Sequence, residues 1–443
     1  MQVHFVMCRH LPNQLRTVFF AVIALAMVWL RAEAADNGVA QTPLMGWSSW
    51  SSSGEGISED KIKAEADAMA TSLKSFGYTY VNIDAGWDKG YDENGRRKTD
   101  LSKFPSGMAA LADYVHGKGL KLGIYLIPGI EDDLLKDNPT ILGTSQTIQD
   151  IVDKGKVGNT LGKNYAIDFS KPGSTEYIQS CVDLLASWGI DYIKMDFVGP
   201  GGGKVPADDR EEIKQWMAAI KKNGHPIWLE LSNSLKFKEV ETWKANSNGW
   251  RIEGDIEDYH STNHSLTSWA KASRRFKDAV EWVGQSGPGG WNDMDSTEIG
   301  AGDKDGLTLD ERYSVFTFWC ICCAPIILGP DLTNLDSTDL GIITNAEVIA
   351  IQQAGIPAKP ISTAGESQVW KVENPDGSCY VALFNLGQSS AHVSVSWSKL
   401  NLTGPMAARD LWSHSDLETM DNELSAQLES HACKLVKLKP PTH

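Results

Sequence analysis

Five acidic residues stand at or close to the ends of apolar segments that have the composition of β-strands. Paired carboxylates among polar groups are what the hydrolysis of a glycosidic bond requires, because one attacks or stabilises the positively charged sugar carbon and the other protonates the leaving oxygen. Two basic side chains lie among them, and each can hold a hydroxyl while lowering the pKa of a nearby carboxyl. The set comprises Asp84, Asp196, Glu230, Asp255 and Asp293, with Lys194 and Arg251.

Each of these carboxylates has an ordinary explanation when it is taken alone. An isolated Asp or Glu in such a place is at least as often a helix N-cap or a solvated loop residue as a functional group. Five strand ends with the same chemistry are not expected from capping alone. In a parallel barrel the C-terminal ends of the strands meet at one rim, so we expect these side chains to lie together there.

The elements that would position these residues follow a βα pattern. Between Pro43 and Pro330, short apolar runs alternate with amphipathic stretches, which favours a parallel sheet or barrel, and the length favours a (β/α)8 TIM barrel. We expect segment 129–165 to be loop decoration and the apolar stretch 316–328 to be helical. The expected strands are 80–84, 121–125, 192–196, 227–231, 250–252, 282–283 and 291–293, and the expected helices are 107–116, 174–188 and 208–222.

The chain is long enough for a second folded domain after the barrel. At 443 residues it exceeds the usual limit of one hydrophobic core. Beyond Pro330, segments such as 368–371, 379–384, 392–397 and 431–438 alternate between apolar and polar residues or run apolar, with Gly, Asn and Ser between them. We therefore predict a catalytic barrel over residues 35–350 and a C-terminal antiparallel β-sandwich over residues 351–443.

The N-terminus has the features of a signal peptide. Arg9 and Arg16 precede an apolar run over residues 18–30, and Ala32, Glu33 and Ala34 form a small-x-small cleavage pattern. The predicted signal therefore covers residues 1–34, and the mature protein would be secreted or periplasmic; an uncleaved anchor is the alternative. No later segment suggests a membrane contact.

Composition excludes some classes of partner and cofactor. The formal net charge of -16 disfavours nucleic acid, whose phosphates attract basic proteins, and the 16 tryptophans suit sugar stacking although core packing explains most of them. The six cysteines outside the predicted signal do not form a disulfide framework, and no histidine lies at zinc-ligand spacing. We expect no metal ion and no organic cofactor.

Several ordered motifs resemble glycoside hydrolase family 27, the α-galactosidase family of clan D. The resemblance implies a retaining mechanism in which Asp196 is the nucleophile and Asp255 the acid/base. It also implies that Trp47, Asp84, Tyr125, Lys194 and Arg251 line the sugar subsite, with Asp293 beside them. The motifs are 42–47, 80–87, 188–196, 251–255, 287–295, 307–311, 324–332 and 345–351.

Three departures from the family pattern concern the substrate. Ala85 stands where the family usually has a second Asp, which removes a partner for the galactose 4- and 6-hydroxyl region. The 2-hydroxyl contact falls on Ser232 or, two residues earlier on the same strand face, on Glu230. Phe197 and Val198 replace residues that often include a disulfide cysteine, and segment 122–130 resembles a divergent branch with β-L-arabinopyranosidase and isomaltose-releasing members.

The leading hypothesis is an exo-acting α-galactosidase-type hydrolase of oligosaccharides or polysaccharide side chains. One alternative keeps the mechanism but changes the glycone to β-L-arabinopyranose or to an α-glucosyl or isomaltosyl unit. Another is a noncatalytic carbohydrate-binding protein, against which the intact set of Asp196, Lys194, Arg251 and Asp255 argues. The sequence leaves the oligomeric state open.

Overall fold

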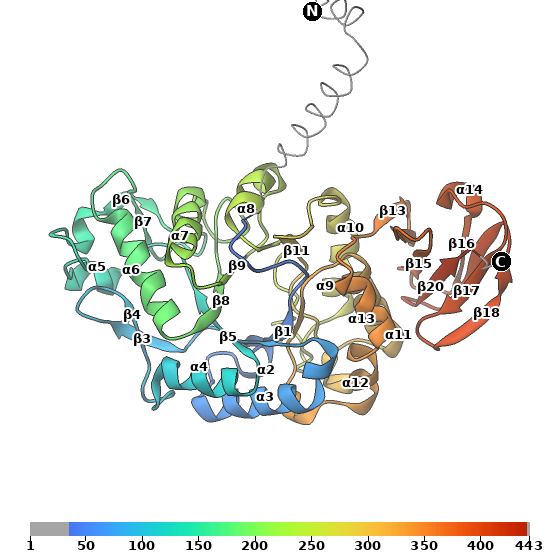
Figure 1. Ribbon diagram of the computed structural model, residues 1–443, viewed down its shortest axis with the longest axis horizontal. Helices are drawn as coiled ribbons and strands as arrows, with labels where there is room; N and C mark the ends of the chain where they lie inside the picture. Colours follow the sequence, from blue (N-terminus) through green and yellow to red (C-terminus); the bar gives the residue numbers. More distant parts are fainter. Residues whose placement is uncertain (1–34, 441–443) are drawn as a thin grey trace, which may run out of the picture.

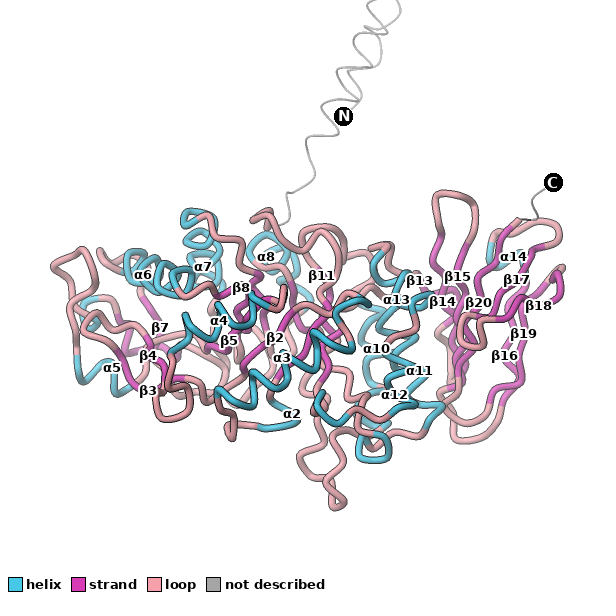
Figure 2. The backbone as a smooth tube through the Cα atoms, turned by 60° about the horizontal axis from the view of Figure 1, so that its bottom comes forward, coloured by secondary structure: helices cyan, strands magenta, loops and turns pink. Residues whose placement is uncertain are grey.

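The computed structural model describes residues 35–440, which form a barrel followed by a smaller β-domain (Figure 1). The predicted signal peptide, residues 1–34, lies outside the described residues. Figure 2 shows the strands of the β-domain gathered at one end of the molecule, beyond the helices that surround the barrel strands. This arrangement confirms the predicted fold class, a TIM-like barrel with a C-terminal antiparallel sandwich.

Eight parallel strands form the curled sheet of the barrel, in the order β11-β10-β9-β8-β5-β2-β1-β12. An isolated bridge between Thr297 and Leu328 links the segment after β11 to β12. The carboxyl ends of all eight strands therefore meet at one rim. The strands are β1 (Met45–Ser48), β2 (Tyr80–Ile83), β5 (Lys121–Leu126), β8 (Ile190–Met195), β9 (Trp228–Leu231), β10 (Gly249–Arg251), β11 (Trp291–Asp293) and β12 (Ile326–Leu328).

Helices cover the outside of the barrel because their apolar residues recur on one face. In α7, Ile213, Trp216, Met217 and Ile220 are buried, and the helix ends at Gly224, whose positive φ suits glycine. The α-helices are α2 (Trp50–Ser53), α3 (Glu59–Ser72), α4 (Gly107–Gly117), α5 (Asp132–Asp137), α6 (Ser174–Ser187), α7 (Arg210–Asn223), α8 (Val240–Asn246), α9 (Trp269–Ala272), α10 (Arg274–Glu281), α11 (Leu309–Ile321), α12 (Ser337–Ile343), α13 (Ala346–Gln353) and α14 (Trp397–Leu400).

Short elements decorate the loops between strands and helices. Two hairpins, β3 with β4 and β6 with β7, pair in antiparallel fashion beside the barrel. The strands are β3 (Asp88–Tyr91), β4 (Arg97–Thr99), β6 (Val152–Val157) and β7 (Tyr165–Ile167), and the 3-10 helices are η2 (Lys74–Phe76), η3 (Ile148–Asp150), η4 (Phe237–Glu239), η5 (Gly302–Asp305) and η6 (Leu332–Asn334).

Three expectations about elements were wrong. The expected strand 282–283 is a turn directly after α10, where Trp282 packs edge-on against Phe237 with ring centroids 5.2 Å apart. The stretch 316–328 is not one helix, because α11 ends at Ile321 and residues 326–328 form β12. Segment 129–165 is not plain loop, since it contains α5, η3 and β6.

The C-terminal domain is built from two antiparallel sheets. One has six strands in the order β13-β14-β15-β20-β17-β18, and the other pairs β16 with β19. Val381, Leu383, Val393 and Leu424 are among the buried residues of its separate core. The strands are β13 (Lys359–Ser362), β14 (Ser367–Glu373), β15 (Cys379–Asn385), β16 (Ala391–Ser396), β17 (Met406–Asp410), β18 (Ser415–Met420), β19 (Glu423–Leu428) and β20 (Cys433–Lys439).

Helix α11 joins the two domains. Phe318 of this helix packs against Phe276 of the barrel with ring centroids 3.9 Å apart, and against Trp370 of β14 at 5.2 Å. The Ser314 hydroxyl also donates a hydrogen bond of 2.6 Å to the His431 carbonyl. An apolar contact that is this extensive holds the sandwich against the barrel.

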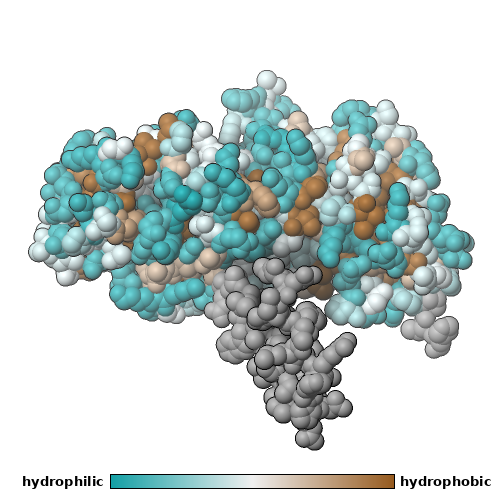
Figure 3. Space-filling model, turned by 90° about the horizontal axis from the view of Figure 1, so that it is seen from above, coloured by the Kyte–Doolittle hydropathy of each residue, from teal (hydrophilic) through white to brown (hydrophobic). Residues whose placement is uncertain are grey.

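The surface is mainly hydrophilic. On the face in Figure 3, hydrophobic residues form small groups that are separated by hydrophilic ones. Within residues 35–440, no helix has the length and apolar character that crossing a membrane requires. All six cysteines in this part of the chain are free.

Glu65 of α3 makes stability depend on pH. Its carboxyl is buried and accepts the Leu332 N–H at 2.9 Å, and burial raises its pKa to about 8. An acid with a raised folded-state pKa contributes full stability below its unfolded pKa and loses it as the pH rises toward 8. The melting temperature of the wild type should therefore fall between pH 5 and pH 8. We expect this fall to be smaller by several degrees in Glu65→Gln, as measured by thermal unfolding followed by circular dichroism.

Glu59 of the same helix is the matched control for this measurement. Although burial opposes it, hydrogen bonds from Lys63 and Ser106 hold the pKa of Glu59 below its usual value. A lowered pKa contributes stability above the unfolded pKa, so Glu59→Gln lowers the melting temperature at pH 8 and has a smaller effect in acid. A parallel pH dependence in the two variants would contradict the assignment to Glu65.

Candidate active site

The structure brings the predicted site residues to the C-terminal rim of the barrel. Asp84 and Asp196 directly follow β2 and β8, and Arg251 and Asp293 are the last residues of β10 and β11. The strand register sets the remaining positions: Lys194 pairs with Tyr125 on one side and with Glu230 on the other. Side chains from neighbouring parallel strands in register share one face, so the polar groups meet inside the rim.

Asp196 is held by three hydrogen-bond donors. Its Oδ1 accepts the Ser232 hydroxyl at 2.6 Å and the Phe197 N–H at 2.8 Å, and its Oδ2 accepts the Tyr125 hydroxyl at 3.2 Å. Only 9% of the residue is exposed. Donors to both oxygens fix the orientation of the Asp196 carboxyl group.

Lys194 and Asp84 form a buried ion pair beside this carboxylate, with Nζ 2.8 Å from Oδ2. Burial lowers the pKa of the Lys194 ammonium, but Asp84 and Asp196 raise it by more, so its pKa lies above the usual value. Asp84 also accepts the Ala85 N–H at 2.9 Å and the Ser48 hydroxyl at 3.4 Å. The ammonium therefore stays charged next to Asp196.

Arg251 binds two carboxyls on the other side of the rim. Its guanidinium donates to Asp255 Oδ1 at 2.5 Å and to Asp295 Oδ1 at 3.2 Å. Burial opposes the charged form, yet these carboxylates hold the pKa of Arg251 well above its usual value. The Asp255 side chain is 35% exposed, in contrast to 3% for Arg251. Asp255 is thus the accessible member of the group.

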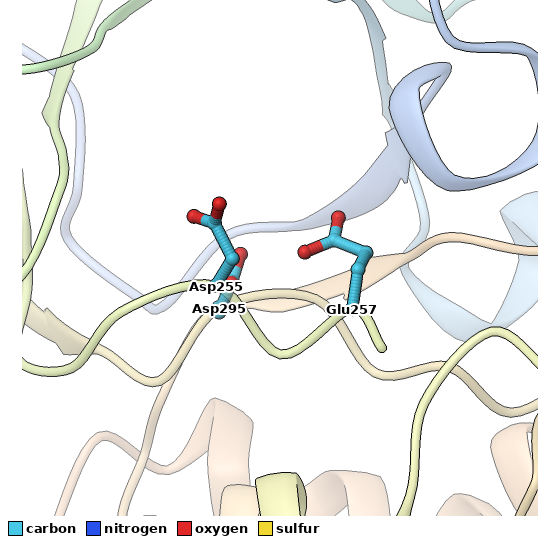
Figure 4. A group of neighbouring side chains, drawn as sticks. All are labelled: Asp255, Glu257 and Asp295. Atoms are coloured by element: carbon cyan, nitrogen blue, oxygen red, sulfur yellow. The ribbon is translucent and has the colours of Figure 1, made fainter. Parts of the chain in front are cut away.

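A third carboxyl, that of Glu257, joins this cluster. One oxygen each from Asp255, Glu257 and Asp295 lies within 4.8 Å of the others. Figure 4 shows Asp255 and Glu257 pointing the same way, with Asp295 behind Asp255. Burial and then the charge of Asp295 raise the pKa of Glu257 to about 7. The guanidiniums of Arg251 and, at 3.8 Å from Asp295, Arg275 supply positive charge to this cluster.

Ser232 and Glu230 are both almost fully buried, but they contact different groups. The Ser232 hydroxyl donates to Asp196, whereas Glu230 accepts the Trp228 indole N–H at 2.8 Å. Burial, together with the nearby Asp293 charge, holds the pKa of Glu230 well above its usual value. This geometry places Ser232, and not Glu230, in contact with Asp196.

Trp47 and Asp293, two predicted site residues, lie near the carboxyl ends of β1 and β11. Trp47 is 1% exposed and donates its indole N–H to the Pro330 carbonyl at 2.8 Å. Asp293 is 3% exposed and accepts the Asp295 N–H at 2.8 Å. Burial and Asp295 raise the pKa of Asp293 to about 6. Both side chains are almost fully buried in this structure.

Four residues of the site were not among the predicted ones. Tyr259, which is 56% exposed, donates to Asp255 Oδ2 at 3.3 Å and accepts the Trp50 indole N–H at 2.8 Å. Asp295 and Glu257 complete the carboxyl cluster. The position of Tyr259 four residues after Asp255 carries no periodic signal, because both lie in a loop without regular structure.

Comparison with known proteins shows which family the chain belongs to. A sequence model of the family described as alpha galactosidase A matches residues 42–133 and 136–354, and one described as the alpha galactosidase C-terminal beta sandwich domain matches residues 364–438. An alpha-galactosidase of Cyamopsis tetragonoloba is 35% identical over 418 residues, which cover 93% of this chain and 89% of the relative. The chain belongs to the α-galactosidase family, glycoside hydrolase family 27.

Solved structures of the family superpose over nearly the whole chain. A β-L-arabinopyranosidase of family 27 from Geobacillus stearothermophilus, solved with arabinose, matches with a TM-score of 0.85 and 32% identity, covering 91% of this chain and 98% of that chain. Alpha-galactosidase I from Mortierella vinacea matches with a TM-score of 0.73 and 29% identity, covering 91% and 98%. The predicted family and the assignment as a glycoside hydrolase of the α-galactosidase type are therefore confirmed.

The sequence leaves two candidates for the contact to the sugar 2-hydroxyl, Ser232 and Glu230, and substitution of each residue can distinguish them. We expect Ser232→Ala to lower kcat/KM on an aryl α-galactoside about tenfold, because a hydrogen bond to a charged group contributes about 1.5 kcal/mol. Glu230→Gln keeps the acceptor for Trp228 and is expected to cause a smaller loss. A greater loss of kcat/KM in Glu230→Gln than in Ser232→Ala would assign the contact to the sugar 2-hydroxyl to Glu230.

Proposed function

We propose that this family 27 hydrolase is a retaining exo-glycosidase with Asp196 as nucleophile and Asp255 as general acid/base. The observation that carries the proposal is the contrast between the two carboxyls. Asp196 is buried among three hydrogen-bond donors and beside the Lys194 ammonium, whereas Asp255 is partly exposed among other carboxyls. The first environment holds a carboxyl in one orientation, as a nucleophile needs, and the second leaves a carboxyl accessible to a leaving oxygen and to water, as a general acid/base needs.

The proposed reaction has two steps. In the first, an Asp196 oxygen forms a bond to the anomeric carbon while the bond to the leaving oxygen breaks and Asp255 gives that oxygen its proton. In the second, Asp255 takes a proton from water, whose oxygen attacks the same carbon and releases Asp196. The hydrogen bonds from Arg251 and Tyr259 hold the Asp255 carboxyl in place for both steps.

The proposed substrate is an α-galactoside in an oligosaccharide or a polysaccharide side chain. The match to alpha-galactosidases over most of the chain supports this glycone. A β-L-arabinopyranoside is the second candidate, because Ala85 offers no carboxylate near the sugar and the arabinopyranosidase structure superposes well. Exposed Tyr259 and half-buried Trp50 lie on the Asp255 side, where the leaving group must be, and their rings suit stacking on it.

We also propose export across a membrane with removal of residues 1–34. Arg9 and Arg16, the apolar run over residues 18–30 and the small residues Ala32 and Ala34 support this. Mass spectrometry of the N-terminus of the protein recovered from its native host would give a mature chain that begins at Ala35; an intact N-terminus in that protein would overturn this part.

Removal of each carboxyl should affect a different step. We expect Asp196→Ala to abolish release of nitrophenol from a nitrophenyl α-galactoside. Asp255→Ala should retain the first step with this good leaving group and stall at the glycosyl-enzyme. Azide needs no general base, so it should restore turnover of Asp255→Ala and give a glycosyl azide with the substrate's anomeric configuration, which nuclear magnetic resonance identifies.

Asp258→Asn is the matched control, since it changes a neighbouring carboxyl outside the cluster, and it should turn over without azide. Normal turnover by Asp196→Ala, or an azide product of inverted configuration, would contradict the assignment of roles.

A further inference from the structure

A pocket adjoins the reaction site around Asp196. It has a volume of about 340 Å³, within the range of small ligand sites. Its floor comes from the ends of β2 and β5, and its outer wall from the hairpin of β3 and β4. Ala85, Gly86, Tyr91, Arg97, Tyr125 and Glu131 are among its lining residues. Tyr125 also donates its hydroxyl to Asp196, so this pocket and the nucleophile share a wall.

The pocket lies across the barrel from the proposed acid/base. In the sheet order, β2 is the fourth neighbour of β10, which places it opposite β10 in an eight-stranded ring. Ala85 follows β2, and Asp255 follows β10. The leaving group must contact Asp255, so the end of the glycone that points away from the leaving group faces the pocket.

Apart from the exposed carboxylate of Glu55, which can accept hydrogen bonds from sugar hydroxyls, the charges of the pocket wall are already paired. Arg97 contacts Asp88 at 2.5 Å and Glu131 at 2.6 Å, and Tyr91 donates its hydroxyl to Glu131 at 2.6 Å. A charged ligand would have to compete with these pairs, whereas a neutral hydroxylated ligand can bond to their remaining lone pairs and N–H groups. The Tyr91 and Tyr125 rings add apolar faces that match the C–H face of a sugar.

Ala85 lies between the pocket and the reaction site. Its methyl group lines the pocket, and it directly follows Asp84, the partner of Lys194 in the reaction site. A longer side chain at this position would occupy the space through which a bound glycone could continue.

We propose that this pocket is a second sugar subsite, which binds a neutral sugar residue attached to the glycone on its non-reducing side. The enzyme then acts on a glycone that carries a further sugar and releases a disaccharide, with the bond between its two sugars intact. This inference rests on the proposed function, since bond cleavage still uses Asp196 and Asp255.

The test compares nitrophenyl α-galactoside with nitrophenyl glycosides of disaccharides in which a second neutral sugar is joined to O4 or O6 of that galactose. We expect kcat/KM to be at least about tenfold higher for one of the disaccharide glycosides, because contacts to a remote part of the substrate raise kcat/KM. Chromatography of the products should show the intact disaccharide.

The Ala85→Leu variant fills the space between the pocket and the reaction site, and Ala85→Ser is its matched control. The readout is the ratio of kcat/KM between disaccharide and monosaccharide glycosides, which a general loss of active protein does not alter. Ala85→Leu should lower this ratio about tenfold, and Ala85→Ser should keep it. The wild-type product pattern provides a test that does not depend on either variant folding.

The outcomes separate this inference from the proposed function. Hydrolysis of the monosaccharide glycoside with no preference for a disaccharide, or release of single sugars alone, overturns the second subsite and leaves the proposed function standing. Failure to hydrolyse any of these glycosides overturns both. A preference that survives Ala85→Leu places the additional contact elsewhere and also overturns the proposal.

Discussion

Two buried cations allow this barrel to gather carboxyls at one rim. A carboxylate that leaves water without a partner is costly, and the cost is offset only by an opposite charge and well-placed donors. Lys194 contributes its charge to Asp84 and Asp196, and Arg251 contributes its charge to Asp255 and Asp295. The two halves of the proposed reaction therefore each have their own cation, and each carboxyl has a different degree of exposure.

The position of these cations follows from the parallel sheet. Lys194 on β8 is in register with Tyr125 on β5, and Arg251 on β10 is in register with Asp293 on β11. Charge pairs between strands hold the strand ends at fixed spacing, so the same contacts that neutralise the rim also orient it. The sandwich lies outside this network. It packs on α11 through aromatic rings, and this contact supports the barrel without reaching Asp196 or Asp255.

Sequence patterns predicted the parts of the site that local rules decide. An apolar run that ends in a carboxylate predicts a strand and its functional end, and this placed Asp196 and Asp84 at the rim. The prediction of a strand at 282–283 was wrong because a tryptophan beside a valine is as common after a helix as in a short strand. Contacts between strands and loops are tertiary properties, so the contact of Ser232, and not Glu230, with Asp196 and the contact of Tyr259 with Asp255 could not be predicted from spacing.

The structure also separates the chemistry from the recognition of the substrate. Asp196, Lys194 and Arg251 belong to strands or directly follow them, where neighbouring strands limit their movement. The pocket beside Ala85 has its outer wall in the hairpin of β3 and β4, which pairs with itself and not with the barrel sheet. Changes in this hairpin can alter the space beyond the glycone without moving the ion pairs of the rim. In the proposed second subsite, one small residue after β2 separates that space from the reaction site, so a single position can change the substrate while the carboxyl chemistry stays the same.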